Sequence, residues 1–201
     1  MDSVGTQTAT QTSTSLQPVY DTGAINGLPA ISFNHTNNDL LNIGNPSGFP
    51  NTGYIIVVWY LNAPVANGYN EYLIGGPSNG TDYGLTGYTG SIDRQTVLLS
   101  GTPGQMWGSA NLSTTAWHAT MITWATGTSA TFYTCASNIC TADGTAQTLG
   151  ANSSNWNNWF GAGNTSTGTT FDGSIARWIF GNSSTPNLTT VGTYLTCKYG
   201  L

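Results

Sequence analysis

Charged residues are almost absent from this chain of 201 residues. Lysine and arginine together number 3, aspartate and glutamate number 8, and charged side chains make up 5% of the sequence, against an ordinary share of about 25%. Three cations, with a formal net charge of −5, cannot build the basic patch that follows a phosphate backbone or an anionic membrane surface. We therefore expect neither nucleic acid nor a membrane among the partners.

Long apolar runs are absent too. No stretch reaches the roughly 20 apolar residues that a membrane-spanning helix needs, and no lysine-led apolar segment of the signal-peptide kind opens the sequence. Large apolar side chains are nevertheless present at spaced positions, as 7 Trp, 10 Tyr and 6 Phe. Disordered chains lack such residues, so the sequence predicts a folded protein of one domain.

Cysteine is scarce, with three in the chain. Cys135 and Cys140 flank an expected hairpin turn, and this spacing allows a cross-strand disulfide that contributes roughly 2 kcal/mol at best. The alternatives are two reduced thiols or a metal site, but two thiols are only half a zinc site. Cys197 is left over, and we expect it to be a small buried hydrophobe.

Residues 1–23 form a predicted polar arm rich in Thr, Gln and Ser. Such a segment has little to bury and is disordered on its own. We expect residues 1–20 to dock on a neighbouring subunit, or on a second copy of the chain, by backbone addition to a sheet edge. Packing along the arm's own domain is the alternative.

Residues 24–201 alternate short apolar segments with clusters of Gly, Asn, Pro and Ser, as antiparallel β-structure does. The segment from Ile55 to Leu61 is apolar at nearly every position, which predicts a strand covered on both faces. The next long strand alternates instead, and its two faces are Trp117, Ala119 and Met121 on one side and His118, Ile122 and Trp124 on the other.

The apolar spacing of the last predicted strand slips by one residue. Phe171 and Ile175 lie on one face, and the apolar pattern resumes at Trp178 rather than one residue earlier. This slip predicts a β-bulge near Ala176 and Arg177, where two residues oppose one on the partner strand.

A turn and a short amphipathic closing segment follow, the latter carrying Val191, Tyr194, Leu195 and Tyr199. Strand, turn and closing segment in this order resemble the end of a laminin-G-like (concanavalin A-like lectin/glucanase) jelly roll. The segments at 52–64, 115–124, 129–140 and 157–164 resemble earlier strands of that family. The resemblance implies an all-β, antiparallel β-sandwich jelly roll over residues 24–201, with a short C-terminal helix.

Glucanases of this superfamily hydrolyse sugars with two closely spaced glutamates on one strand. This chain has a single glutamate, Glu71, and its aspartates are scattered. A Gly-x-Ser-x-Gly match at residues 76–80 is expected to be a turn, because no helix can follow it. We therefore expect the protein not to be an enzyme.

Some members of the laminin-G-like family hold calcium at the sandwich rim with an aspartate and backbone carbonyls. The candidates that the resemblance implies here are Asp82, Asp93 and Asp172, although no acidic cluster marks a site. We therefore expect no cofactor or metal, with calcium as the alternative.

Aromatic residues in Gly/Asn-rich segments are the best candidates for binding. A ring can stack on the C–H face of a sugar while nearby Asn, Asp and Ser contact its hydroxyls. Core packing is the alternative for any large aromatic residue, and we expect it for Trp59, Trp117 and Trp178. The expected glycan-binding candidates lie in loops, and they are Tyr83, Tyr88, Trp107 and Trp156.

Two functions fit these features. The first is a virion surface or capsid-decorating structural protein, from a bacteriophage, docked through its N-terminal arm on other virion subunits. The second is a secreted or cell-surface module for glycan binding or adhesion. The sequence identifies neither the host, nor a glycan, nor the oligomeric state.

Overall fold

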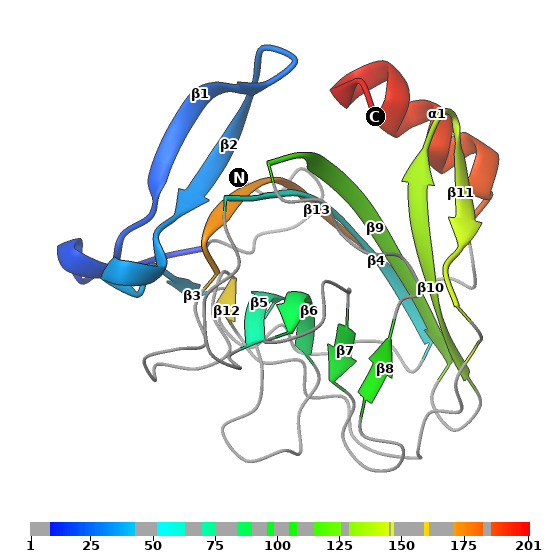
Figure 1. Cartoon of the computed structure of the whole chain (residues 1–201), viewed down its shortest axis with the longest axis horizontal. Coiled ribbons are helices and arrows are strands. Elements are labelled where there is room, and N and C mark those ends of the chain that lie inside the picture. The colour runs from blue at the N-terminus through cyan, green and yellow to red at the C-terminus, as the bar shows by residue number, and fades with distance from the viewer. Residues whose placement is uncertain are drawn as a thin grey trace.

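The computed structural model describes residues 9–42, 52–62, 70–74, 84–89, 96–98, 105–107, 115–125, 129–144, 146, 159–160, 171–182 and 186–201. Two antiparallel sheets face each other, and one α-helix lies on the outer side of the larger sheet (Figure 1). The predicted all-β sandwich with a C-terminal helix is confirmed. No helix among these residues is long and apolar enough to cross a membrane.

The larger sheet has seven strands. Their spatial order is β1 (Val19–Ile25), β2 (Leu28–Phe33), β13 (Gly173–Gly181), β4 (Thr52–Leu61), β9 (Trp117–Ala125), β10 (Ser129–Ala136) and β11 (Ile139–Ala142). The smaller sheet has six, in the order β3 (Leu41–Asn42), β12 (Trp159–Phe160), β5 (Asn70–Ile74), β6 (Gly84–Thr89), β7 (Thr96–Leu98) and β8 (Gln105–Trp107). The helices are the short 3-10 turns η1 (Thr14–Leu16) and η2 (His35–Asn37), and α1 (Leu188–Tyr199).

The main core lies on the inner face of the seven-stranded sheet. Strand β4 is buried on both faces, as its apolar run predicts, with Trp59 pointing inward and Val58 outward and both 0% exposed. The indole nitrogen of Trp59 donates to Thr120 Oγ1 at 3.0 Å, which satisfies its one polar atom. The predicted alternation of β9 is also confirmed, because Ile122 packs in the inner core and Met121 in the outer one.

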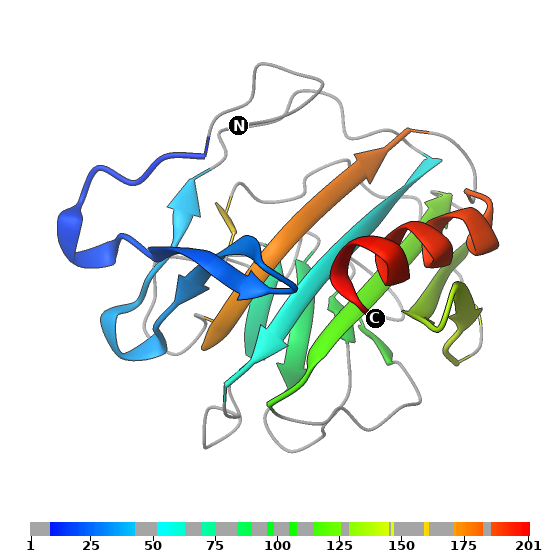
Figure 2. The ribbon, with the colours of Figure 1, turned by 90° about the horizontal axis from the view of Figure 1, so that it is seen from above.

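Helix α1 covers part of the outer face of the seven-stranded sheet (Figure 2). Asn187 caps its first turn by accepting a hydrogen bond from Thr190 N at 2.9 Å. The helix ends at Gly200, whose φ of 75° suits a residue without a side chain. Leu195 and Tyr199 are buried against the sheet, one helical turn apart.

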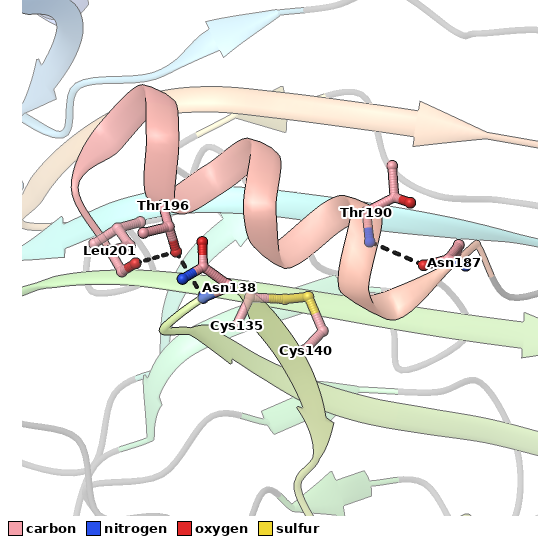
Figure 3. Close-up of a disulfide and its surroundings, with 7 residues drawn as sticks. All are labelled: Cys135, Asn138, Cys140, Asn187, Thr190, Thr196 and Leu201. Atoms are coloured by element: carbon pink, nitrogen blue, oxygen red, sulfur yellow. Dashed lines mark hydrogen bonds between the residues drawn. A yellow bond between two sulfur atoms is a disulfide. The ribbon is translucent and has the colours of Figure 1, made fainter.

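The hairpin of β10 and β11 anchors this helix. Cys135 and Cys140 lie opposite each other in the hairpin and are joined by a disulfide beneath α1 (Figure 3). At the turn of the hairpin, Asn138 N donates to Thr196 Oγ1 at 2.9 Å. The Thr196 hydroxyl in turn donates to the carbonyl oxygen of Leu201. These bonds hold the end of the helix on the hairpin.

Cys197 is exposed, which contradicts its expected burial. It lies midway between Leu195 and Tyr199 in sequence, and these two residues define the buried side of the helix. A position two residues from both is rotated by about half a turn, towards solvent.

Part of the predicted N-terminal arm, residues 1–23, is a strand. Residues 19–25 form β1, which pairs with β2 at the edge of the seven-stranded sheet. This strand is almost wholly exposed, with Val19 at 66% and Tyr20 at 65%. Apart from Ile25, which is buried in the outer core, backbone pairing rather than apolar burial holds it, and for this reason the sequence pattern did not reveal a strand.

The described part of the arm before β1 also contacts its own domain. Thr10 N donates to Asn42 O at 2.7 Å, and Asn42 N donates back to Thr10 O at 2.8 Å. Leu40 N donates to Leu16 O at 3.1 Å. These bonds satisfy the N–H and carbonyl groups of Thr10 and the carbonyl group of Leu16 within the domain, as the alternative of packing along the domain predicts.

The β-bulge predicted in the last strand is confirmed. Ile175 lies opposite Trp59 and Arg177 lies opposite Val58, so Ala176 is the extra residue. Ala176 packs against the outer core, whereas Trp178 packs against the inner one. The bulge thus returns Trp178 to the core and leaves Arg177 on the outer face.

Candidate functional site

Four residues form one row across the outer face of the seven-stranded sheet. Ser32 lies opposite Ser174, Ser174 opposite Tyr60, and Tyr60 opposite Trp117. Residues directly opposite each other in an antiparallel sheet share a face. Tyr60 is two residues from the outward-facing Val58, so the whole row points outward. We call these four residues the outer platform.

The outer platform combines two aromatic rings with two hydroxyls. The ring centroids of Tyr60 and Trp117 are 5.5 Å apart at an interplanar angle of 51°. The hydroxyls of Ser32 and Ser174 are hydrogen-bonded to each other at 2.7 Å. All four residues are half-buried, so each packs on the sheet and still presents surface to solvent. Seen from above, α1 crosses β4 and β9 away from the ends of the strands that carry Tyr60 and Trp117 (Figure 2).

Arg177 stands in the neighbouring row of the same face. It lies opposite Val58, which is two residues from Tyr60 along β4, and this spacing corresponds to roughly 7 Å. Its Nε atom is buried and has no hydrogen-bond partner. The side chain as a whole is half-buried, so part of it remains accessible to solvent.

The C-terminal end of α1 brings a second cation to this face. The ammonium of Lys198 lies 5.4 Å from the ring centroid of Tyr194 and 5.6 Å from that of Tyr199. It also donates to the Tyr194 hydroxyl at 3.1 Å. The amide nitrogen Nδ2 of Asn26, at the tip of the β1–β2 hairpin, donates to Lys198 O at 3.2 Å, so hairpin and helix end meet above the sheet.

Tyr199 is influenced by both cations. Burial and, to a smaller extent, the neighbouring Tyr194 raise its pKa to about 12, while the positive charge of Arg177 acts in the opposite direction. The phenol is therefore neutral at physiological pH and can both donate and accept a hydrogen bond. Aromatic faces, hydroxyls and two cations on one face suit a polar, ring-shaped ligand.

The structure places the candidates expected from the sequence on the other sheet or outside the described residues. Tyr88 and Trp107, expected in loops, lie in strands β6 and β8 of the six-stranded sheet, separated by β7. Glu71 lies in β5 of that sheet. The other two glycan-binding candidates, Tyr83 and Trp156, lie outside the described residues.

Of the three calcium candidates, Asp82 and Asp93 lie outside the described residues, as does the segment 76–80. Asp172 is half-buried, and its carboxylate oxygen Oδ1 accepts a hydrogen bond from Asn62 Nδ2 at 3.2 Å. Asn62 N also donates to Asp172 O at 3.0 Å, so Asp172 joins the segments that follow β4 and precede β13. The described residues contain no group of three or more His, Cys, Asp or Glu side chains that could hold a metal ion.

The sequence reading missed the outer platform. Trp117, expected in the core, packs against the outer core but is only half-buried at the start of β9, where it meets Tyr60. The same expectation is confirmed for Trp59, which is fully buried. The residue alternation of β9 placed Trp117 on one face correctly, but it could not tell that α1 covers only part of that face.

No family model and no curated protein matches the sequence. Among solved structures, the chain is similar to the enzymatically active domain of tailspike protein 2 of bacteriophage CBA120, with a TM-score of 0.63 and 18% identity over 94% of this chain and 30% of that one. It is also similar to a mutant Trypanosoma rangeli sialidase with trans-sialidase activity, with a TM-score of 0.60 and 12% identity over 90% of this chain and 30% of that one.

A third similar structure is domain 4 of the extracellular arabinanase AbnA of Geobacillus stearothermophilus, in complex with arabinotriose. Here the TM-score is 0.56 and the identity 11%, over 89% of this chain and 81% of that one. At such identities the likeness shows a common β-sandwich fold. The chain spans less than a third of the tailspike and sialidase chains.

The prediction that the protein is not an enzyme is contradicted by these likenesses. It rested on the single Glu71, which rules out only the paired glutamates of glucanases. The tailspike domain is described as enzymatically active, and the other two structures belong to a sialidase and an arabinanase. The single glutamate therefore does not exclude enzymatic activity.

Proposed function

We propose that this chain is a glycan-binding domain of a virion-associated extracellular protein, and that the outer platform is its binding surface. The observation that carries the proposal is the pairing of Tyr60 with Trp117 on a partly uncovered sheet face, beside the hydroxyls of Ser32 and Ser174. A sugar ring offers an apolar C–H face and a hydroxyl rim, and the platform matches both.

The similar structures support this proposal. The arabinanase domain was solved with a bound oligosaccharide, and the tailspike belongs to a bacteriophage. The laminin-G-like class that the sequence resembles is a further part of the proposal. It is supported by the two facing antiparallel sheets and by the adjacency of β13 to β4 in the larger one.

The contacts of the arm favour glycan binding over capsid decoration. Docking through residues 1–20 requires an arm with unsatisfied amides, but Thr10 is paired with Asn42 of β3 and Leu16 O accepts from Leu40 N. The pairing of β1 with β2 extends this attachment to residue 19. The arm from Thr10 onward is thus bound to its own domain.

The experiment measures binding on a glycan array, and then by calorimetry for each glycan that binds. Trp117→Ala and Tyr60→Ala should each weaken binding by roughly 1–3 kcal/mol, the loss expected for an aromatic anchor. Tyr20→Ala is the matched control, because Tyr20 is an aromatic residue of the same sheet that is 65% exposed on the edge strand β1. Its substitution should leave binding unchanged.

Two results would refute the proposal. The first is an array on which no glycan binds the wild-type protein. The second is binding that survives both platform substitutions but is lost in Trp107→Ala or Tyr88→Ala, which would locate the site on the six-stranded sheet. Unfolding of every variant is followed in parallel, so that a loss of binding is not confused with a loss of fold.

A further inference from the structure

The protein has few cationic side chains, and two of them lie on the outer face of the seven-stranded sheet. The whole sequence holds 3 Lys and Arg residues, and two of them, Arg177 and Lys198, act on Tyr199: the Lys198 ammonium lies 5.6 Å from its ring centroid, and the charge of Arg177 lowers its pKa. They come from distant parts of the chain, one from β13 and the other from α1. Folding therefore creates a local positive charge on a protein whose formal net charge is −5.

Neither cation is neutralised by a carboxylate among the described residues. Arg177 keeps a buried Nε without a partner, and Lys198 uses its ammonium on the neutral Tyr194 hydroxyl. Asp21 shares this face through its pairing with Ala30, but it lies on β1, two strands away from β13. Its carboxylate oxygen Oδ1 also accepts a hydrogen bond from Gly23 N at 3.0 Å.

The bulge in β13 determines where Arg177 points. Because Ala176 is inserted, Arg177 lies opposite Val58 on the outer face, one row from Tyr60. A sugar stacked on the rings of Tyr60 and Trp117 therefore has the guanidinium beside it. Arginine forms strong, charge-assisted hydrogen bonds with carboxylates, often in pairs.

We infer that the outer platform selects acidic glycans, with Arg177 binding a sugar carboxylate and Lys198 adding a second positive charge. This inference rests on the proposed function and names its ligand class. The two kinds of residue have different roles. The aromatic rings bind the face of the sugar, and the cations distinguish a charged sugar from a neutral one.

The experiment compares two pairs of probes that differ in a carboxylate. Tri-galacturonic acid is compared with its methyl ester, and 3′-sialyllactose with lactose, by calorimetry with the full chain. We expect the acidic member of at least one pair to bind about tenfold more tightly, as one charged hydrogen bond provides. This preference should shrink when the salt concentration is raised, because screening weakens a half-exposed charge pair.

Substitutions test which residues cause the preference for the acidic member of each pair. Arg177→Gln should remove most of the preference by weakening the acidic member much more than the neutral one, and Lys198→Gln should reduce the preference by a smaller factor. Arg177→Lys keeps the charge and should retain part of the preference, which separates an electrostatic role from a merely structural one. Trp117→Ala should instead weaken both members of a pair equally.

The outcomes separate the two proposals. Equal binding of acidic and neutral members, with loss of both in Trp117→Ala, overturns the charge selectivity and leaves glycan binding standing. A preference that survives Arg177→Gln and Lys198→Gln together overturns the assignment of these residues. Binding of sulfated glycans alone on an array overturns the choice of carboxylate, and binding of no glycan overturns both proposals.

Discussion

Replacing Gly192 by alanine tests how closely α1 packs on the β10–β11 hairpin. A Cβ atom built on Gly192 would lie 2.5 Å from the carbonyl carbon of Asn138 and closer still to the backbone N and Cα of Ile139. Ordinary contact begins at 3.4 Å, so the approach is at least 0.9 Å too close. The obstructing atoms are backbone, which cannot rotate away as a side chain would.

Two effects of opposite sign determine the result. Overpacking costs typically 1–3 kcal/mol, and the upper end applies where backbone must move. Alanine is better than glycine in a helix by about 1 kcal/mol, which offsets part of this cost. We expect a net loss of roughly 2 kcal/mol in the free energy of unfolding, which lowers the Tm of a chain of this size by about 4–8 °C.

Urea unfolding and calorimetry measure the change, and Thr193→Ala is the matched control. Thr193 is the next residue of α1 and is exposed, so its substitution should be neutral or slightly stabilising. If Gly192→Ala is as stable as the wild type or more so, helix propensity alone decides and the close packing of helix on hairpin is refuted.

Two further predictions concern the disulfide and a buried carboxylate. Reducing the Cys135–Cys140 bond, which closes a loop with a sequence separation of 5, should cost about 2 kcal/mol of stability. Before reduction, a thiol reagent should modify only Cys197. Modification of all three cysteines in the native protein would contradict the presence of the disulfide. Burial raises the pKa of Asp39 above its ordinary 3.8, although a hydrogen bond from the backbone of Asn34 opposes this. The folded protein therefore binds this proton more tightly than the unfolded chain does, and stability should fall as pH rises from about 4 through the raised pKa. Asp39→Asn should remove this dependence, so a difference in stability between wild type and variant that stays constant from pH 3 to pH 7 would argue against it.

The strands that bury side chains could be predicted from the sequence. The alternation of β9, the two-sided burial of β4 and the bulge of β13 all follow from apolar spacing, because a core selects residue types at regular intervals. Strand β1 could not be found in this way. Its residues are exposed from Val19 to Gly23, and its place in the sheet is maintained by backbone hydrogen bonds that any sequence can form.

The candidate site could not be predicted from the sequence for a different reason. Ser32, Ser174, Tyr60 and Trp117 come from four strands, and only the register between those strands brings them into one row. Local patterns assign each residue to a face but not to a neighbour. The exposure of Cys197 was, by contrast, within reach of the sequence, because the helical spacing of Leu195 and Tyr199 already defines the buried side of α1.

The bulge in β13 links the core to the proposed site. Without the extra residue, strict alternation from the inward-facing Ile175 would point Arg177 into the core and Trp178 out of it. A buried, unpaired guanidinium is very costly, whereas Trp178 contributes an edge-to-face contact with Phe33 at 6.5 Å. Core packing thus explains why residue 177 faces outward, but any polar residue would meet that requirement. Packing does not explain why an arginine stands there in a sequence with so few charges, and the acidic-sugar binding that we propose beside Tyr60 and Trp117 would account for it.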